Sequence, residues 1–89
     1  MKFSEALELA KQGAKISRKG WNGKGMFIFL VNGNSIKNAI NESYGDPTKD
    51  GYNVLDFLMM FTAQKDMVPW LASQTDILAK DWDVVDCEK

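Results

Sequence analysis

Hydrophobic side chains recur at every third or fourth position near the start of the chain, which is the spacing of an amphipathic helix. Ser4 stands at the beginning of this stripe as a candidate N-cap, and Gly13 follows it as a left-handed C-terminal stop. The pattern therefore predicts a helix over residues 4–12. Its apolar stripe consists of Phe3, Ala6, Leu7, Leu9 and Ala10.

Four later stretches have the composition of β-strands. Met26–Val31 is apolar at every position, so we expect a strand covered on both faces, by the helix on one and by another subunit on the other. Val54–Ala63 predicts a second long strand, and Lys15–Arg18 a short one. Asp81–Val85 alternates polar and apolar residues, which is typical of a final edge strand.

Turn and cap signals separate these strands. Residues 34–42 predict a short helix, whereas Tyr44–Tyr52 contains Asp-Pro and Asp-Gly and predicts a surface loop. Gln64–Asp66 predicts a hairpin tip. Ser73 opens a sequence that resembles a capping box, with Asp in place of the usual Glu or Gln, and a short helix is expected over Gln74–Lys80.

These elements add up to one small α+β domain over residues 1–89, with a mainly antiparallel β-sheet, an N-terminal helix and a short C-terminal helix. The chain has 45% hydrophobic and 26% charged residues, which is the composition of an ordinary globular protein. A chain of 89 residues buries only about 60% of its unfolded surface, so the core is expected to be small.

Composition excludes several classes of function. The chain has no histidine, which removes His-based triads, His general bases and His-ligated zinc. Its net charge of −1 argues against binding to a nucleic acid polymer. Its one cysteine cannot form an internal disulfide, and no apolar run is long enough to span a bilayer. With no export signal, we expect a cytosolic protein without metal or cofactor.

The charge is unevenly distributed, because residues 1–31 carry a net +4 and the remaining 58 residues a net −5. Three of the cations, Arg18, Lys19 and Lys24, flank the glycine-rich segment Gly20–Gly25. The exposed N–H groups of such a loop suit phosphate, and Trp21 offers a flat face for a base or sugar. The alternative is a tight hairpin whose tryptophan packs on the core.

A second cluster covers Val68–Asp76. Pro-Trp places Trp70 at the end of a strand, and the N-terminus of a helix follows at once. Ser73 and Thr75 offer hydroxyl groups, and Gln74 offers an amide that can read a base edge. The alternative is that Ser73 and Asp76 only cap the helix.

A third candidate is the pair of carboxylates that flanks Trp82. Alternation predicts that Trp82 points inward and that Asp81 and Asp83 point outward. Paired carboxylates can perform acid–base chemistry or hold a metal, but these two have no further ligand set and are interpreted as surface charge. Met59 and Met60 are interpreted as core or interface, and Cys87 as no nucleophile.

The order of these motifs resembles one family, the second class of phage Thoeris anti-defence proteins. The resemblance rests on Phe3-x-x-Ala6-Leu7, Gly13, the block from Arg18 to Met26, the block from Val68 to Asp76, and Asp81-Trp82. Residues 32–53 carry no motif of the family and form the part that varies. The resemblance covers most of the chain.

The resemblance implies a sponge that binds the cyclic ADP-ribose isomer made by a bacterial TIR protein, 1″–3′ glycocyclic ADP-ribose, without cleaving it. The effector is then not activated and NAD is not depleted. It further implies a homo-oligomer, typically a tetramer, with pockets between protomers, acting in the cytoplasm of the infected bacterial host. Binding without catalysis also agrees with the absence of histidine.

Residue chemistry then suggests individual roles in ligand binding. Trp21 and Trp70 are expected to stack on the base and sugar. Arg18, Lys24 and the loop amides, which include Gly23, are expected to face the diphosphate. The side chains expected to meet ribose hydroxyls and base edges are those of Asn22, Ser73, Gln74, Thr75 and Asp76.

Two other classes of function stay open at this point. The first is a protein-interaction module that inhibits a defence protein directly through its apolar surface and tryptophan loop. The second is a small nucleotide hydrolase that uses Asp76 or the pair Asp81 and Asp83. Recovery of intact nucleotide from a complex would exclude the hydrolase, and a stoichiometric protein partner without nucleotide would favour the interaction module.

Overall fold

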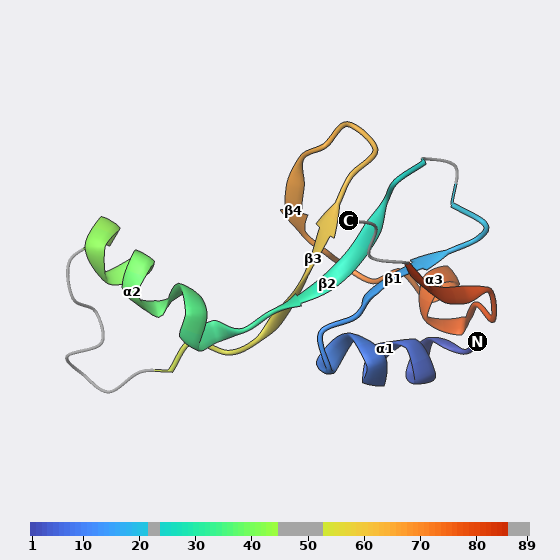
Figure 1. Ribbon diagram of the computed structural model, residues 1–89, viewed down its shortest axis with the longest axis horizontal. Helices are drawn as coiled ribbons and strands as arrows, with labels where there is room; N and C mark the ends of the chain where they lie inside the picture. Colours follow the sequence, from blue (N-terminus) through green and yellow to red (C-terminus); the bar gives the residue numbers. More distant parts are fainter. Residues whose placement is uncertain (22–23, 45–52, 86–89) are drawn as a thin grey trace.

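Five antiparallel strands and three helices make up the computed structural model, which describes residues 1–21, 24–44 and 53–85 (Figure 1). The fold is therefore α+β, as predicted. In chain order the elements are α1 (Phe3–Lys11), β1 (Lys15–Arg18), β2 (Phe27–Val31), α2 (Gly33–Tyr44), β3 (Phe57–Phe61), β4 (Met67–Pro69), α3 (Gln74–Leu78) and β5 (Trp82–Val85).

The strands form one sheet in the order β4-β3-β2-β1-β5. All neighbours pair antiparallel, so the last strand of the chain returns to pair with the first. This places β5 at an edge, as its alternating pattern predicted, and β1 inside the sheet between β2 and β5. No helix in the described ranges is both long and apolar enough to cross a membrane.

One face of the sheet, which we name the covered face, packs against α1. Ala6 and Ala10 of the helix are fully buried against Ile16 of β1, Ile28 of β2 and Trp82 of β5. The two alanines are small enough to let the helix backbone approach the sheet closely. These five residues are the buried core, and α3 lies beside α1 at the same end of the molecule (Figure 1).

The other face of the sheet, which we name the open face, has neither α1 nor α3 on it (Figure 1). Cross-strand partners lie on the same side of a sheet, so the register assigns a row of large apolar side chains to this face. Its members are Phe27, Phe29, Phe57, Met59, Phe61 and Met67. The expectation of one covered face on β2 is therefore confirmed, and its second face is uncovered among the described elements.

The cap of α1 differs from the prediction. The helix begins at Phe3 with Lys2 as its N-cap residue, so Ser4 lies inside the first turn. The Glu5 carboxylate accepts a hydrogen bond from the Lys2 N–H at 2.8 Å and stabilises this end of the helix. The C-terminal stop is confirmed, since Gly13 has φ +104°, a conformation that glycine adopts without strain.

Helix α2 lies apart from the sheet, at the end of an extension formed by β2 and the stretch before β3 (Figure 1). The helix predicted over 34–42 is confirmed and runs further, from Gly33 to Tyr44. The Gly33 N–H donates to Asp56 Oδ1 at 2.8 Å, and Gly33 packs so closely on the Val54 carbonyl that a side chain there would collide with it. These contacts fix the position of the first turn of α2. The strand β3 runs from Phe57 to Phe61 and is therefore shorter than the predicted strand Val54–Ala63.

The turn between β3 and β4 is confirmed as a hairpin tip. The Thr62 N–H donates to the Asp66 carbonyl at 2.8 Å, and Lys65 takes a positive φ of 70° to close the turn. The predicted surface loop at 44–52 begins with the last residue of α2. The rest of that loop lies outside the described residues, as does Cys87.

Candidate functional site

An arginine joins the two sequence blocks that the motif analysis singled out. Arg18, at the end of β1, donates from Nε to Asp81 Oδ1 at 2.8 Å and from NH1 to Asp76 Oδ1 at 2.7 Å. Its side chain is 17% exposed, so both ion pairs are partly shielded from water. The pairing of β1 with β5 brings Arg18 close to Asp81, although 63 positions of sequence separate the two residues.

Asp76 connects α3 to the glycine-rich segment. Its Oδ1 atom accepts a second hydrogen bond, from the indole Nε1 of Trp21 at 3.2 Å. The Asp76 N–H donates in turn to the Ser73 hydroxyl at 3.1 Å, which confirms Ser73 as the N-cap of α3. Trp21, Arg18, Asp76 and Ser73 thus form one continuous hydrogen-bonded chain.

Three tryptophans pack around the same point. Trp82 is 1% exposed and lies between Trp21 and Trp70, each edge-on to it, with ring centroids 5.3 and 6.1 Å away. Phe3 of α1 completes the cluster at 5.1 Å from Trp82. Trp21 and Trp70 are half-buried, so part of each indole packs on the core and part faces solvent.

The ion pairs shift the pKa values of all three charged groups. Hydrogen bonds from Arg18 and from the Gly20 N–H lower the pKa of the Asp81 carboxyl below its ordinary value. Partial burial raises the pKa of Asp76, but hydrogen bonds from Arg18 and Trp21 outweigh it and lower that pKa as well. The two carboxylates raise the pKa of Arg18. All three groups therefore stay charged at neutral pH.

The remaining predicted site residues divide into two groups. Lys24, Gln74 and Thr75 are exposed and lie near this cluster in sequence. Asn22 and Gly23 lie outside the described residues. The structure therefore joins Arg18, Trp21, Ser73 and Asp76 directly and places Trp70 beside them, while the ligand roles of all ten residues stay predictions.

Asp81 is the residue whose role the sequence interpretation missed. It was interpreted as surface charge beside Asp83, but it is the partner of Arg18 and accepts a hydrogen bond from the Gly20 N–H at 2.8 Å. Asp83 fits that interpretation, since it is exposed. The only signal in the sequence was that Asp81 directly precedes Trp82, and nothing there indicated that β5 pairs with β1.

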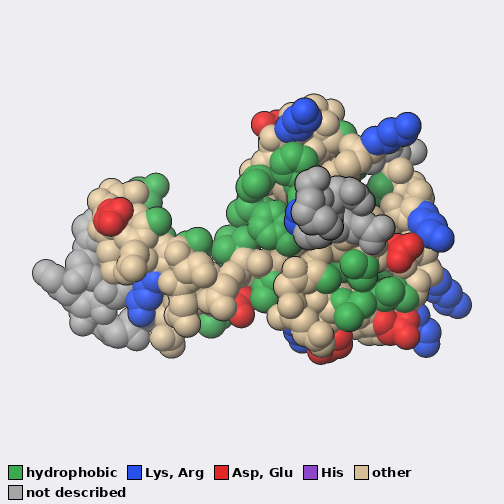
Figure 2. Space-filling view, in the orientation of Figure 1, with side chains coloured by type: hydrophobic (Ala, Val, Ile, Leu, Met, Phe, Trp, Pro, Cys, Tyr) green, Lys and Arg blue, Asp and Glu red, His purple; other side chains and the backbone are tan. Residues whose placement is uncertain are grey.

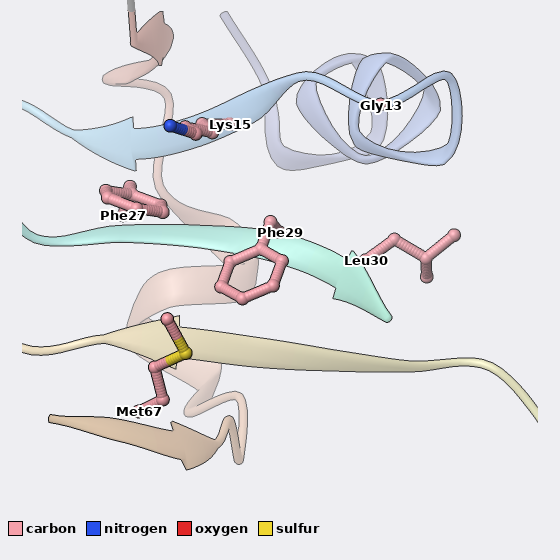
Figure 3. Close-up of a pocket in the computed structure, with 6 residues that line it drawn as sticks. All are labelled: Gly13, Lys15, Phe27, Phe29, Leu30 and Met67. Atoms are coloured by element: carbon pink, nitrogen blue, oxygen red, sulfur yellow. The ribbon is translucent and has the colours of Figure 1, made fainter. Parts of the chain in front are cut away.

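Two shallow cavities lie elsewhere on the molecule. The first, about 280 Å³, opens on the open face between Lys15 of β1, Phe27 and Phe29 of β2, and Met67 of β4 (Figure 3). The Lys15 ammonium lies 4.9 Å from the centre of the Phe27 ring, a cation–π distance. The second, about 250 Å³, lies between α1 and α3. In Figure 2, hydrophobic side chains gather over the region of β2, β3 and β4.

Comparison with known proteins gives the family. The family model described as Tad2-like, the Thoeris anti-defense 2-like domain, matches residues 1–85. This chain belongs to that family. It is also 39% identical over 85 residues to Thoeris anti-defense 2 of Bacillus phage SP01, with 96% of this chain and 94% of that protein covered.

Membership in the Tad2-like family confirms the resemblance drawn from the sequence motifs and gives the chain a phage anti-defence role against Thoeris. The family is named for opposing a defence system rather than for a reaction, which suggests a protein that does not catalyse one. Among the described residues, no group of three acidic, cysteine or histidine side chains is arranged to hold a metal ion.

Proposed function

We propose that this Tad2-like protein acts as a sponge for 1″–3′ glycocyclic ADP-ribose, the cyclic ADP-ribose isomer made by Thoeris TIR proteins. It binds the signal in the cytoplasm of the infected host and does not cleave it, so the effector that depletes NAD is not activated. Membership in the Thoeris anti-defence family supports this function. To compete with an effector the protein needs a nanomolar dissociation constant, about −12 kcal/mol.

The observation that carries the proposal is the hydrogen-bonded chain from Trp21 through Asp76 to Ser73. It holds an aromatic ring beside a short row of polar groups, where Gln74 and Thr75 are exposed. A ligand with adenine, two riboses and a diphosphate needs aromatic faces together with polar partners of this kind. Lys19 and Lys24, which flank the glycine-rich segment in sequence, are exposed and would supply positive charge for the diphosphate.

We further propose that the ligand pocket is shared between copies of this chain in a homo-oligomer, a tetramer in the form that the resemblance implies. The two cavities described above, which lie among the described residues, have volumes of about 280 and 250 Å³, just below the roughly 300–1,000 Å³ of typical ligand sites, and neither is lined by the expected ligand residues. A second copy would complete the walls of a pocket that one chain of this size cannot enclose.

The surface of the chain supports such an assembly. Met67 on the open face is 59% exposed, and Phe27, Phe29, Met59 and Phe61 are only half-buried. Assembly through the open face would bury this apolar surface.

Calorimetric titration with 1″–3′ glycocyclic ADP-ribose, followed by heating the complex and chromatography of the released nucleotide, tests the proposal. We expect nanomolar binding and recovery of the intact ligand. A hydrolysed product would instead identify an enzyme. Absence of binding, together with a stoichiometric protein partner in a pull-down, would identify an interaction module.

Trp21→Ala sharpens this test. Loss of one base–aromatic stack costs about 1–3 kcal/mol, so we expect the variant to bind the same nucleotide at least about fivefold more weakly. Tyr44→Ala is the matched control, because Tyr44 is an 81% exposed aromatic residue on α2. If Trp21→Ala stays folded by circular dichroism and binds within about threefold of the wild type, Trp21 does not stack on the ligand.

A further inference from the structure

Asp81 holds three consecutive residues of the chain where β1 ends. Its carboxylate accepts from Arg18 Nε and from the Gly20 N–H, both at 2.8 Å, and its carbonyl accepts from the Lys19 N–H at 3.1 Å. One residue of the C-terminal strand region thus sets the path of the backbone into the glycine-rich segment.

These contacts extend to Trp21. The Trp21 N–H donates to the Arg18 carbonyl at 3.3 Å, and the Trp21 indole donates to Asp76, the second carboxylate on Arg18. A change in the position of Arg18 or Gly20 therefore moves the backbone of Trp21 and the partner of its indole together. The Asp81 carboxylate itself is already occupied by Arg18 and Gly20.

We propose that Asp81 is a positioning residue of the ligand site: it fixes Arg18 and Gly20, and through them the orientation of Trp21, without touching the ligand. This inference rests on the proposed function. Its physical basis is that a binding group held in place before binding loses less conformational entropy when the ligand arrives. Hydrogen bonds to a charged group, such as those to Asp81, are strong enough to hold a loop in this way.

The test combines ligand affinity with a direct view of Trp21 in the free protein. Asp81→Asn keeps the shape of the side chain but loses its charge and one of its two acceptor oxygens. We expect it to bind 1″–3′ glycocyclic ADP-ribose about tenfold more weakly or worse in calorimetry, at a temperature where it is folded. In its ¹H–¹⁵N spectrum without ligand, the indole signal of Trp21 and the amide signal of Gly20 are expected to move.

Asp83→Asn is the matched control, since it removes the same charge from the same strand region at an exposed carboxylate. We expect its affinity to stay within about twofold of the wild type, because exposed charges contribute little, and both signals to stay in place. Gly20→Ala is a second, independent variant that leaves Asp81 intact. Its methyl group would lie 2.8 Å from Asp81 Oδ2 and push the carboxylate aside, so it should weaken binding in the same direction.

Three results would overturn the inference. Wild-type affinity in folded Asp81→Asn would show that the residue has no effect on the site. Weaker binding with unchanged Trp21 and Gly20 signals in the free protein would show that Asp81 contacts the ligand itself. Absence of binding by the wild-type protein would instead refute the proposed function, and the positioning role in binding with it.

Discussion

The two faces of the sheet differ in what covers them, although the same strands form both. On the covered face, Ile16 and Ile28 are fully buried beneath α1. On the open face, Phe27 stacks on Phe61 at 5.0 Å, and Met67 remains 59% exposed. The covered face therefore stabilises the fold of a single chain, while the open face has a large apolar area left for contacts with another molecule.

A second difference concerns polar groups. At the covered face, Arg18 and its two carboxylates close the end of the sheet beside the tryptophan cluster. On the open face, the cation of Lys15 lies over an aromatic ring instead of a carboxylate. Hydrophobicity of a strand therefore does not decide its role. On one side of β2, Ile28 is buried in the core, while Phe27 and Phe29 on the other side are only half-buried.

The largest effect is expected on the covered face. Trp82→Ala removes the indole that Phe3, Trp21 and Trp70 pack against, and it removes the donor to the Asp76 carbonyl. Deleting a buried aromatic side chain costs about 3–5 kcal/mol, a large part of the stability of a small domain. Urea unfolding of the variant and of the wild type would measure this loss in the free energy of unfolding. A loss below about 1 kcal/mol would contradict the central place given to Trp82.

On the open face we expect association to change and the fold to persist. Phe29→Glu puts a carboxylate into the apolar surface, and burying it in an interface without a partner is costly. Sedimentation velocity should show a wild-type oligomer and a variant of about 10.0 kDa. Ser4→Glu adds the same charge on α1, on the opposite side, and should leave the oligomer intact. A wild-type monomer would refute the assembly, and an unchanged oligomer in Phe29→Glu would show that the assembly does not form through the open face.

The smallest effect is expected from acid. The pKa values of Asp76 and Asp81 are lowered in the folded protein, so both carboxylates add stability above their ordinary pKa of about 4. That contribution is lost as the pH falls below about 4 and the carboxylates take up protons. Thermal unfolding measured from pH 6 to pH 3 should show this loss as a lower melting temperature. Asp81→Asn should have a flatter profile, and an identical profile would contradict the role of its ion pair.

Much of the fold was predictable because it depends on neighbouring residues. The stripe of α1, the stop at Gly13, the hairpin tip and the Ser73 cap were read from short-range patterns and are confirmed. The prediction of Ser4 as the N-cap of α1 was wrong. The Glu5 carboxylate accepts a hydrogen bond from the Lys2 N–H, and the helix begins at Phe3 instead of residue 4. Ends of elements are decided by single hydrogen bonds, which patterns of hydrophobicity do not resolve.

The candidate site was predictable only in part. The sequence by itself determined the two tryptophan-containing blocks that are predicted to bind the ligand, and the structure joins several of their polar residues. Only the tertiary structure decided that Arg18 faces two carboxylates, that Asp81 is one of them, and that α1 covers one face of the sheet and not the other. Those outcomes depend on the pairing of β1 with β5, whose residues are more than 60 positions apart. No local pattern encodes the partner of an edge strand, because backbone hydrogen bonds are the same whichever strand supplies them.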